Sequence, residues 1–489
     1  MLTYQSTRSG FTASPAQAIL QGLAPDGGLF IDPTLGARPF DWQGCLKKDW
    51  LSMAAMILSH LLPDIEGMEE LVRQAYLGKF EGEDLTPLVP VGEDFVLELF
   101  RGPTAAFKDV ALSMLPRLLS AAKRQSGIKE EIVILTATSG DTGKAALHGF
   151  RDVEGVRILV FYPDGGVSPI QQLQMTTPEG KNVGVCAVRG NFDDCQRAVK
   201  EAFARGQEIP GVRLSSANSI NIGRLAPQIV YYFDAYKNLV ASGGVKPGDP
   251  VDFSVPTGNF GDILAGYFAK LMGLPVGTLI CASNANRVLT DFLETGVYDK
   301  RRPFLKTSSP SMDILVSSNL ERLLFLALDC DPEKTARCMT ALREDGIYTL
   351  EPEAMRRIRD TFAACCCDEA ATGDVIGAVW REHRYLLDPH TAVAFHAAAA
   401  YKKSGAPRRP LVILATASPY KFPDPVLSAL GQQAPGDAFE RMAALEKMTG
   451  VPMPRHLAEL RGKPVLHRDV IDRDAIVPYV ITKLRAKEK

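Results

Sequence analysis

Residues 131–143 read Glu131-Ile132-Val133-Ile134-Leu135-Thr136-Ala137-Thr138-Ser139-Gly140-Asp141-Thr142-Gly143. They combine a short apolar run, a loop that contains glycine, and the start of a helical pattern. A continuous apolar strand of this kind is typical of a parallel sheet, whose strands are buried on both faces by helices. The stretch therefore predicts an α/β fold in which functional loops follow the strands, because ligands collect at the carboxyl ends of parallel strands.

The same order of strand, glycine loop and helix recurs along the chain, which predicts parallel sheets flanked by helices. Residues from about 285 to 400 are mainly helical by pattern. Within them, Asp388 followed by Pro389 is typical of a helix start, with Asp as the N-cap. Further strands are predicted at residues 156–161, 182–188, 251–255 and 411–414.

The chain of 489 residues exceeds the size at which one hydrophobic core stops growing, so we expect more than one packed domain. Helical apolar spacing dominates the start of the chain, as in residues 50–58. We predict an N-terminal helical domain over residues 1–95, a catalytic α/β region of two subdomains over 96–400, and a C-terminal part over 401–489 that completes the site.

The overall composition favours small-molecule chemistry. The formal net charge of −2 gives no support for binding nucleic acid or an anionic membrane surface. No run reaches the roughly 18 apolar residues of a membrane span, and the first residues lack the apolar part of a secretory signal, so we expect a cytoplasmic protein. The nine cysteines show no zinc-ligand spacing and no disulfide framework, so we expect reduced thiols and no metal site. The sequence leaves the oligomeric state open.

Three loops that follow predicted strands stand out, at residues 136–143, 256–262 and 415–422. A glycine loop at a helix N-terminus directs free N–H groups and the positive end of the helix dipole at a ligand, which suits phosphate or carboxylate. Any one loop is explained equally well by a tight turn, but together they indicate an anionic ligand held at two points. Their spacing matches neither a nucleotide P-loop nor a Rossmann dinucleotide motif.

Lys108 lies in an apolar stretch, residues 102–109, directly before a helical run. A lysine that such neighbours desolvate can lose its proton near neutral pH and form a Schiff base. The alternative is a surface lysine at a helix start, although that end of a helix is unfavourable for a cation. Composition alone leaves both interpretations open.

Taken in order, the motifs resemble the long form of threonine synthase found in bacteria and fungi. This is a family of fold type II pyridoxal-phosphate enzymes with a tryptophan-synthase-β-like fold. Each motif is modest alone, but their order along nearly the whole chain is highly specific. The matching stretches are residues 4–8, 22–30, 102–109, 138–143, 167–171, 216–221 and 258–261.

The resemblance implies that pyridoxal 5′-phosphate is the cofactor and that Lys108 holds it as a Schiff base. Thr416 matches the residue that faces the pyridine nitrogen, where a neutral hydroxyl suits eliminations and replacements. The loop that cradles the cofactor phosphate at a helix N-terminus is matched by Gly258, Asn259, Phe260 and Gly261.

The resemblance also implies the substrate and the reaction. O-phospho-L-homoserine and water would give L-threonine and phosphate by γ-elimination and β-addition of water, the last step of threonine biosynthesis. Lys108 would remove the α-proton. The loop that grips the substrate carboxylate is matched by Ser139, Gly140, Asp141 and Thr142, and the segment that lines the substrate side carries Asn218, Asn221 and Arg224.

A dianionic leaving group needs cations, and four lie in or beside the motifs: Arg101, Lys144, Arg224 and Lys421. Solvated surface charge is the alternative for each of them. Arg101 stands where the family has His, and Lys144 stands where a small residue is usual. Ser418 with Tyr420 also departs from the family's last loop.

Two further interpretations remain open. A phospholyase of the same fold would release a 2-oxo acid and ammonia instead of adding water. The departures from the family pattern at residues 101, 144 and 418 are compatible with this interpretation. A catalytically silent binding relative is the other, although the intact Lys108 argues against it. His390 matches a family motif as well, and we expect a structural role for it at a helix start.

Overall fold

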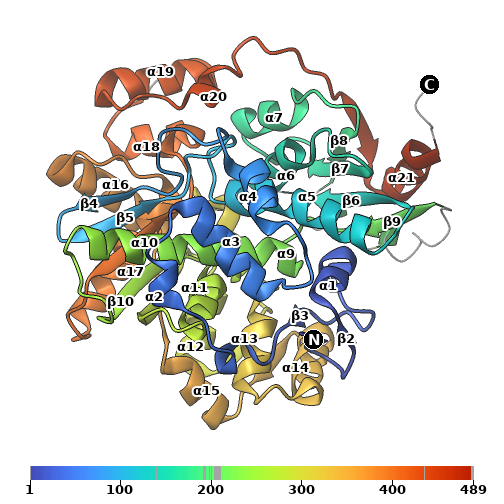
Figure 1. Ribbon diagram of the computed structural model, residues 1–489. Helices are drawn as coiled ribbons and strands as arrows, with labels where there is room; N and C mark the ends of the chain where they lie inside the picture. Colours follow the sequence, from blue (N-terminus) through green and yellow to red (C-terminus); the bar gives the residue numbers. More distant parts are fainter. Residues whose placement is uncertain are drawn as a thin grey trace.

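Two sheets of mainly parallel strands form the framework of the protein, and helices pack around both (Figure 1). The structure is a computed structural model that describes residues 2–138, 140–190, 194, 195, 197, 199, 201, 202, 211–433 and 435–485. The larger sheet has the order β14-β11-β10-β15-β5-β4, and only its β4–β5 pair is antiparallel. The smaller sheet, β16-β8-β7-β6-β9, is parallel throughout. The predicted α/β class is confirmed.

The strands predicted from apolar runs are all present. They are β6 (Glu131–Ala137), β7 (Val156–Pro163), β8 (Val183–Arg189), β10 (Val251–Pro256) and β15 (Leu411–Ala415). The remaining strands of the two sheets are β4 (Leu88–Val91), β5 (Asp94–Glu98), β9 (Val212–Ser215), β11 (Val276–Ser283), β14 (Phe362–Cys366) and β16 (Asp469–Asp472).

Strand β10 shows how the larger sheet is buried on both faces. Phe253 and Val255 belong to the main apolar core. The intervening Ser254 donates its hydroxyl to the Ala394 carbonyl at 2.8 Å, on helix α17 (Pro389–Lys403). That helix begins at Asp388 and Pro389 as predicted, and the Asp388 side chain accepts two backbone N–H bonds. The alternation of a two-sided strand therefore fixes the layer order of helix, sheet and helix.

Helices surround the two sheets and connect successive strands. The described α-helices between β5 and β11 are α5 (Lys108–Gln125), α6 (Asp141–Phe150), α7 (Pro169–Thr176), α9 (Ile222–Leu225), α10 (Ile229–Ala241) and α11 (Gly261–Leu271). The region from 285 to 400 is mainly helical, as predicted, with α12 (Val288–Thr295), α13 (Leu320–Ala327), α14 (Pro332–Glu344), α15 (Pro352–Arg359) and α16 (Glu369–His383). It also contains β14 and the hairpin of β12 (Val297–Asp299) and β13 (Ile347–Thr349).

The N-terminal segment packs onto α5 and α10 and shares their core. Its Tyr76 hydroxyl donates to the Val110 carbonyl at 2.9 Å, and Trp50 donates to Thr86 at 3.0 Å. It contains helices and also a small antiparallel sheet, so it is not purely helical. The predicted division at residues 95 and 400 stays a prediction. The elements are α1 (Pro15–Gln21), α2 (Trp42–Cys45), α3 (Trp50–Leu61), α4 (Met68–Tyr76), β1 (Tyr4–Ser6), β2 (Thr12–Ala13) and β3 (Phe30–Ile31).

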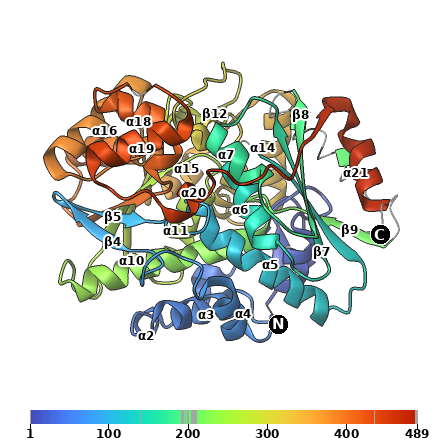
Figure 2. The same ribbon diagram turned by 90° about the horizontal axis from the view of Figure 1, so that it is seen from above.

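The C-terminal segment spans both sheets. Strand β15 lies in the larger sheet, and β16 joins the edge of the smaller one beside β8. Figure 2 shows the chain crossing between them, and along this path the N–H groups of Leu466 and His467 both donate to the Thr176 carbonyl. The helices are α18 (Pro423–Ala429), α19 (Ala438–Thr449), α20 (Arg455–Ala458) and α21 (Ile476–Arg485). Among the described residues, no helix combines the length and apolar character of a membrane span.

Candidate active site

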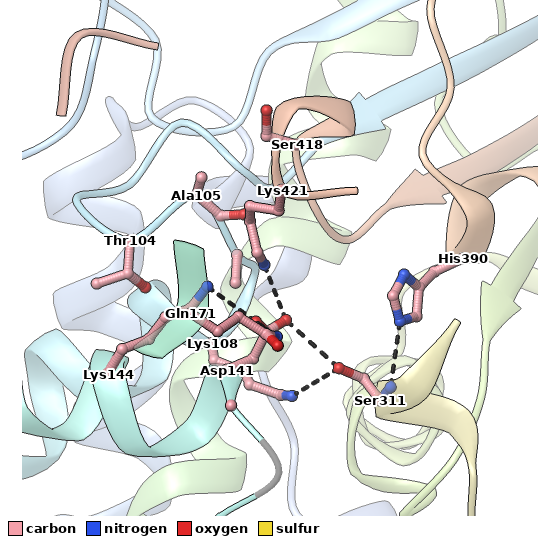
Figure 3. A network of polar contacts seen from close by, with 12 residues as sticks. Thr104, Ala105, Lys108, Asp141, Lys144, Gln171, Ser311, His390, Ser418 and Lys421 are labelled. Atoms are coloured by element: carbon pink, nitrogen blue, oxygen red, sulfur yellow. Dashed lines mark hydrogen bonds and ion pairs between the residues drawn. The ribbon is translucent and has the colours of Figure 1, made fainter. Parts of the chain in front are cut away.

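The loops that follow β6, β10 and β15 come together, as the sequence predicts for the carboxyl ends of parallel strands. Asp141 begins α6 after β6, and Lys421 lies in the short helix η5 (Pro419–Lys421) after β15. Their side chains form an ion pair at 2.8 Å. Ser311, beside the loop after β10, donates to the same aspartate at 3.4 Å (Figure 3). Segments that lie hundreds of residues apart in sequence therefore form one site.

The loop before α5 places Lys108 at the first residue of that helix. The carboxylate of Asp109 accepts hydrogen bonds from the Thr104 N–H at 2.9 Å and the Thr104 hydroxyl at 2.6 Å. Ala105 adopts a left-handed φ of 56°, which is unusual for a residue with a side chain. The Phe107 N–H donates to the Thr416 carbonyl at 2.9 Å. These contacts fix the loop against the end of β15 and so orient Lys108.

Lys108 lies in a setting that favours its neutral amine. Its Nζ is 3.4 Å from the Ser311 hydroxyl. Burial lowers the pKa of Lys108 to about 8; Arg224 and Lys421 act in the same direction, and Asp141 opposes them. An amine with this pKa is partly unprotonated near neutral pH, as a nucleophile for a carbonyl must be. The structure thus supports the desolvated lysine over the surface alternative.

Asp141 is the centre of a buried polar cluster. Its Oδ1 contacts the Lys144 ammonium at 2.8 Å and accepts from the Gln171 amide at 3.0 Å. Its Oδ2 contacts Lys421 at 2.8 Å. Burial alone would raise the pKa of Asp141, but the charges of Lys144 and Lys421 hold it well below its usual range. Asp141 is therefore an ionised carboxylate held in place by two buried cations.

Lys144 and Lys421 are equally and fully buried. The side chain of Lys144 has no exposed surface, and its Nζ contacts both Asp141 Oδ1 and the Gln174 carbonyl oxygen Oε1, the latter at 2.7 Å. Burial, and then the neighbouring charge of Lys421, holds the pKa of Lys144 well below its usual range, although Asp141 opposes this shift. The surface alternative considered for Lys144 and Lys421 is wrong, because both side chains are fully buried.

His390 supports the site from behind. Its Nε2 accepts the Ser311 N–H at 3.2 Å, and its Nδ1 lies 2.7 Å from Asp388 Oδ1. Because Nε2 accepts, Nδ1 carries the proton and donates it to the aspartate. His390 thus orients the backbone of Ser311, which agrees with the structural role expected for it.

The loop after β10 forms a concave backbone site at the start of α11. Phe260 has a φ of 61° and precedes Gly261, the first residue of the helix. A Cβ on Gly258 would lie 2.8 Å from the Ser311 carbonyl oxygen, so this close approach requires glycine. The Asn259 carbonyl accepts the N–H of Asn319 at 3.1 Å, which ties the loop to α13. A glycine-shaped cradle with the free N–H groups of a helix start fits the phosphate of pyridoxal phosphate.

Thr416 lies at the end of β15, is almost fully buried, and is held by the backbone bond to Phe107. The next loop also meets the Lys108 loop, because the Ser418 N–H donates to the Ala105 carbonyl at 3.2 Å. Tyr420 points away from the cluster, since its hydroxyl donates to the Val451 carbonyl. Of the two departures in this loop, only Ser418 borders the site.

The segment with Asn218, Asn221 and Arg224 is held mainly by contacts within the protein. Asn221 is fully buried; its amide donates to the Ile19 carbonyl at 2.9 Å, and its Oδ1 accepts the Gly223 N–H at 2.9 Å. Arg224 donates from Nη1 to the Ala217 carbonyl at 2.7 Å, whereas its buried Nε has no partner among the described residues. Burial lowers the pKa of Arg224 to about 10. Its charge acts on Lys108, so it lies within electrostatic reach of the site.

The remaining predicted residues differ in how close they come to the cluster. Gly140 has a φ of 135°, and a Cβ there would lie 2.5 Å from the Gln171 amide, so glycine is required at this turn. Thr142 lies partly exposed in the first turn of α6. Ser139 lies outside the described residues. Arg101 pairs with Glu98 and keeps 37% of its side chain exposed, so it is not part of the Asp141 cluster.

Sequence reasoning did not assign a site role to Ser311, Gln171 or Gln174. Gln171 lies in one of the matching motifs, where it closes a capping box with Ser168, so its local role was visible but its bond to Asp141 was not. Ser311 lies far from the other site residues in sequence, and no strand or glycine loop marks it. Only the folded arrangement brings these side chains to Asp141.

Comparison with known proteins agrees with this arrangement. The family model described as "Pyridoxal-phosphate dependent enzyme" matches residues 82–417, and that described as "Threonine synthase, C-terminal" matches residues 391–471. The threonine synthase of Pseudomonas aeruginosa is 40% identical, over 95% of this chain and all of that protein. Threonine synthase-like 1 of Pongo abelii is 38% identical, over 85% of this chain but 58% of that protein.

A solved structure is similar along the whole chain. The crystal structure of threonine synthase from Brucella melitensis with bound PLP has a TM-score of 0.87 and 37% identity, and it covers 99% of this chain and 100% of its own. Similarity of this extent covers the Lys108 loop, the glycine loop after β10 and the C-terminal segment together. The chain belongs to the threonine synthase family of pyridoxal-phosphate dependent enzymes.

Proposed function

We propose that this protein converts O-phospho-L-homoserine and water into L-threonine and phosphate. The observation that carries the proposal is the position of Lys108, an amine with a lowered pKa between a glycine-shaped phosphate cradle and a buried cluster of cations. The substrate carries two anionic groups and an amine, which match a site with cations beside a reactive lysine.

The cofactor residues have separate roles in this proposal. Lys108 holds the cofactor covalently through Nζ, and the backbone of Gly258, Asn259, Phe260 and Gly261 binds its phosphate. Thr416 contacts the ring nitrogen through a neutral hydroxyl. When bound, pyridoxal phosphate supplies an electron sink for the carbanion that forms when a proton leaves the substrate.

Lys108 would also move protons of the bound substrate. Its Nζ is free to take the proton from the substrate α-carbon and to return one there at the end of the reaction. The Ser311 hydroxyl, 3.4 Å from Nζ, keeps the amine directed into the site, and His390 fixes the backbone of Ser311. One base therefore serves more than one step.

The substrate's anionic groups are assigned to two walls of the site. The loop with Ser139, Gly140, Asp141 and Thr142 binds the carboxylate through the N–H groups at the start of α6. Asn218 and Arg224 line the opposite side, where the buried, unpartnered Nε of Arg224 is suited to the phosphate. Asn221 orients this segment, because its amide groups are already used by Ile19 and Gly223.

A phospholyase of the same fold is the second candidate function. The observation that favours it is Lys144, which the family resemblance does not lead one to expect and which lies inside the cluster. A phospholyase would release a 2-oxo acid instead of L-threonine.

The cytoplasmic location and the absence of nucleic-acid partners stay predictions.

Product analysis separates the two candidates. Purified protein loaded with pyridoxal phosphate is incubated with O-phospho-L-homoserine, and L-threonine and 2-oxobutyrate are assayed together for the wild type and for Lys108→Ala. We expect L-threonine from the wild type alone. If 2-oxobutyrate forms without L-threonine, the protein is a phospholyase. If neither product forms, the proposed substrate is wrong.

A further inference from the structure

The Asp141 cluster contains two buried lysines, and its one carboxylate can neutralise only one of them when both are protonated. Lys144 and Lys421 each contact one oxygen of Asp141 at 2.8 Å, and neither lysine side chain has any exposed surface (Figure 3). A buried ammonium without its own counter-ion is costly, because the low-polarity interior favours the neutral form. One carboxylate therefore stabilises one ammonium well and two poorly.

The hydrogen bonds of Lys144 are compatible with either protonation state. Its Nζ contacts two acceptors, Asp141 Oδ1 at 2.8 Å and Gln174 Oε1 at 2.7 Å. A neutral amine has two N–H groups and can donate to both acceptors, so loss of the third proton breaks neither bond. Lys144 can thus gain and lose a proton without rearranging α6.

We propose that Lys144 takes up a proton when an oxyanion of the substrate binds beside the cluster, and that it thereby makes affinity for the anionic substrate depend on pH. This inference rests on the proposed function only for the identity of the substrate. An incoming oxyanion supplies the counter-charge that Asp141 cannot give to both lysines. The cluster then holds two protonated lysines, one carboxylate and the oxyanion.

The direction of the pH effect follows from this linkage. The low pKa of Lys144 comes from burial and from Lys421. A bound oxyanion favours the protonated lysine, so affinity is highest at low pH and falls as pH rises through the range in which Lys144 loses its proton. The dissociation constant rises by up to about tenfold per pH unit in that range.

Other titratable groups face Lys144, and the test must separate them. On the front side they are Asp141 and Lys421, and Lys108 interacts with both of these. Behind Lys144 lies a cavity of about 370 Å³ whose charged and titratable lining includes His148, Arg151, Glu179, His456, Glu459 and Lys463. Burial lowers the pKa of both histidines, so they stay neutral above about pH 7. The cavity also leaves room for an arginine in place of Lys144.

Calorimetry on the cofactor-loaded protein tests the proposal without turnover. Sulfate stands for the substrate phosphate and acetate for its carboxylate, since neither anion titrates near neutral pH. Titrations at about pH 7.5 in two buffers of different ionisation enthalpy give the number of protons bound. For the wild type we expect uptake of roughly half to one proton with at least one of the two anions. Uptake with sulfate assigns the phosphate end of the substrate to the cluster, and uptake with acetate assigns the carboxylate end.

Two variants of Lys144 should change the affinity for the anion in opposite directions. Lys144→Arg is always charged, so its affinity should stay high and independent of pH; Lys144→Met is never charged, so its affinity should be low and independent of pH. Neither should take up a proton. His456→Asn, on the cavity wall, is the matched control and should behave as the wild type.

A purely structural role for Lys144 would weaken binding in both variants and leave the proton uptake unchanged. Proton uptake that persists in Lys144→Met, or no uptake by the wild type with either anion, overturns the proposal. These outcomes do not depend on which product the enzyme forms, so failure here is distinct from failure of the proposed function.

Discussion

Two helices begin at the site, and each carries a buried aspartate in its first turn with the opposite electrostatic outcome. Asp141 on α6 pairs with Lys144 and Lys421, which hold its pKa well below the usual range. Among the described residues, the side chain of Asp262 on α11 accepts from the hydroxyls of Tyr231 at 2.5 Å and Tyr232 at 3.2 Å and pairs with no cation, and burial raises its pKa to about 7. Similar burial therefore favours the ionised acid at Asp141 and the protonated acid at Asp262, because the partners differ.

The difference separates two ways of binding an anion. At α11 the acid has a pKa of about 7 and is turned toward the tyrosines, so the glycine-shaped cradle acts through backbone N–H groups. At α6 the acid is ionised and collects buried lysines, so the binding depends on side-chain charge. We expect the first site to tolerate changes of pH and the second to respond to them.

The largest effect is expected from Lys108→Ala, which removes the reactive amine that both anion sites flank. Formation of L-threonine should fall by at least about a thousandfold, because both the covalent attachment and the proton transfer are lost. Rates of L-threonine formation by wild type and variant, both at saturating cofactor, measure the loss. Activity within tenfold of the wild type would contradict the role given to Lys108.

Asp141→Asn tests the charged side of the comparison. It leaves Lys144 and Lys421 buried without a counter-charge, so we expect a loss of about 3–5 kcal/mol of stability near neutral pH. Because the pKa of Asp141 is lowered by folding, its contribution is present above its unfolded pKa and lost as pH falls. Chemical denaturation of wild type and variant gives the difference in their free energies of unfolding. The control is Asp424→Asn, which removes an exposed ion pair with Arg441 and should cost less than about 1 kcal/mol.

Gly258→Ala tests the backbone side. The new Cβ would lie 2.8 Å from the Ser311 carbonyl oxygen, so the loop must shift and cofactor affinity should fall by about ten- to a hundredfold. Fluorescence titration of the unloaded protein with pyridoxal phosphate measures this affinity. Gly373→Ala, where no atom lies within 4 Å, is the matched control and should bind the cofactor as the wild type does.

Asp262→Asn, at a residue without an assigned role in binding, tests only the pH dependence of stability and sharpens the contrast between the two aspartates. Folding raises the pKa of Asp262 to about 7, so its ionisation destabilises the folded state progressively as pH rises from about 4 to about 7. Relative to the wild type, the variant should gain up to about 4 kcal/mol over that range, because each unit of pKa shift corresponds to about 1.4 kcal/mol. Denaturation midpoints at several pH values measure the change. If the difference in unfolding free energy between variant and wild type does not change with pH, folding does not raise the pKa of Asp262.

The sequence predicted the backbone side of the site better than the charged side. Residues 258–261 follow an apolar strand directly, so the loop and the helix start are local features, whereas the need for glycine at 258 comes from the distant Ser311. The apolar neighbours of Lys108 singled it out as a candidate, and only the family resemblance chose between the two interpretations. Strand β14, by contrast, was missed inside a mainly helical region, because its Ala-Ala-Cys-Cys pattern is neither β-branched nor strongly apolar.

The Asp141 cluster could not be predicted in detail, because its contacts join residues that are distant in sequence. Lys421 meets Asp141 across 280 positions, and Ser311 meets it across 170. Local periodicity cannot report whether a lysine is on the surface or in a buried pair, so each cation was left with a surface alternative. The side chain of Arg101 is partly exposed, whereas those of Lys144 and Lys421 are fully buried.

The central claim is that Lys108, among the three lysines close to the site, carries the cofactor. Reducing the loaded protein with borohydride makes the covalent link permanent, and peptide mass mapping then locates it. We predict the added mass of the cofactor on the peptide that contains Lys108 and no added mass on those with Lys144 or Lys421. Cofactor found on Lys144 or Lys421 would contradict the account.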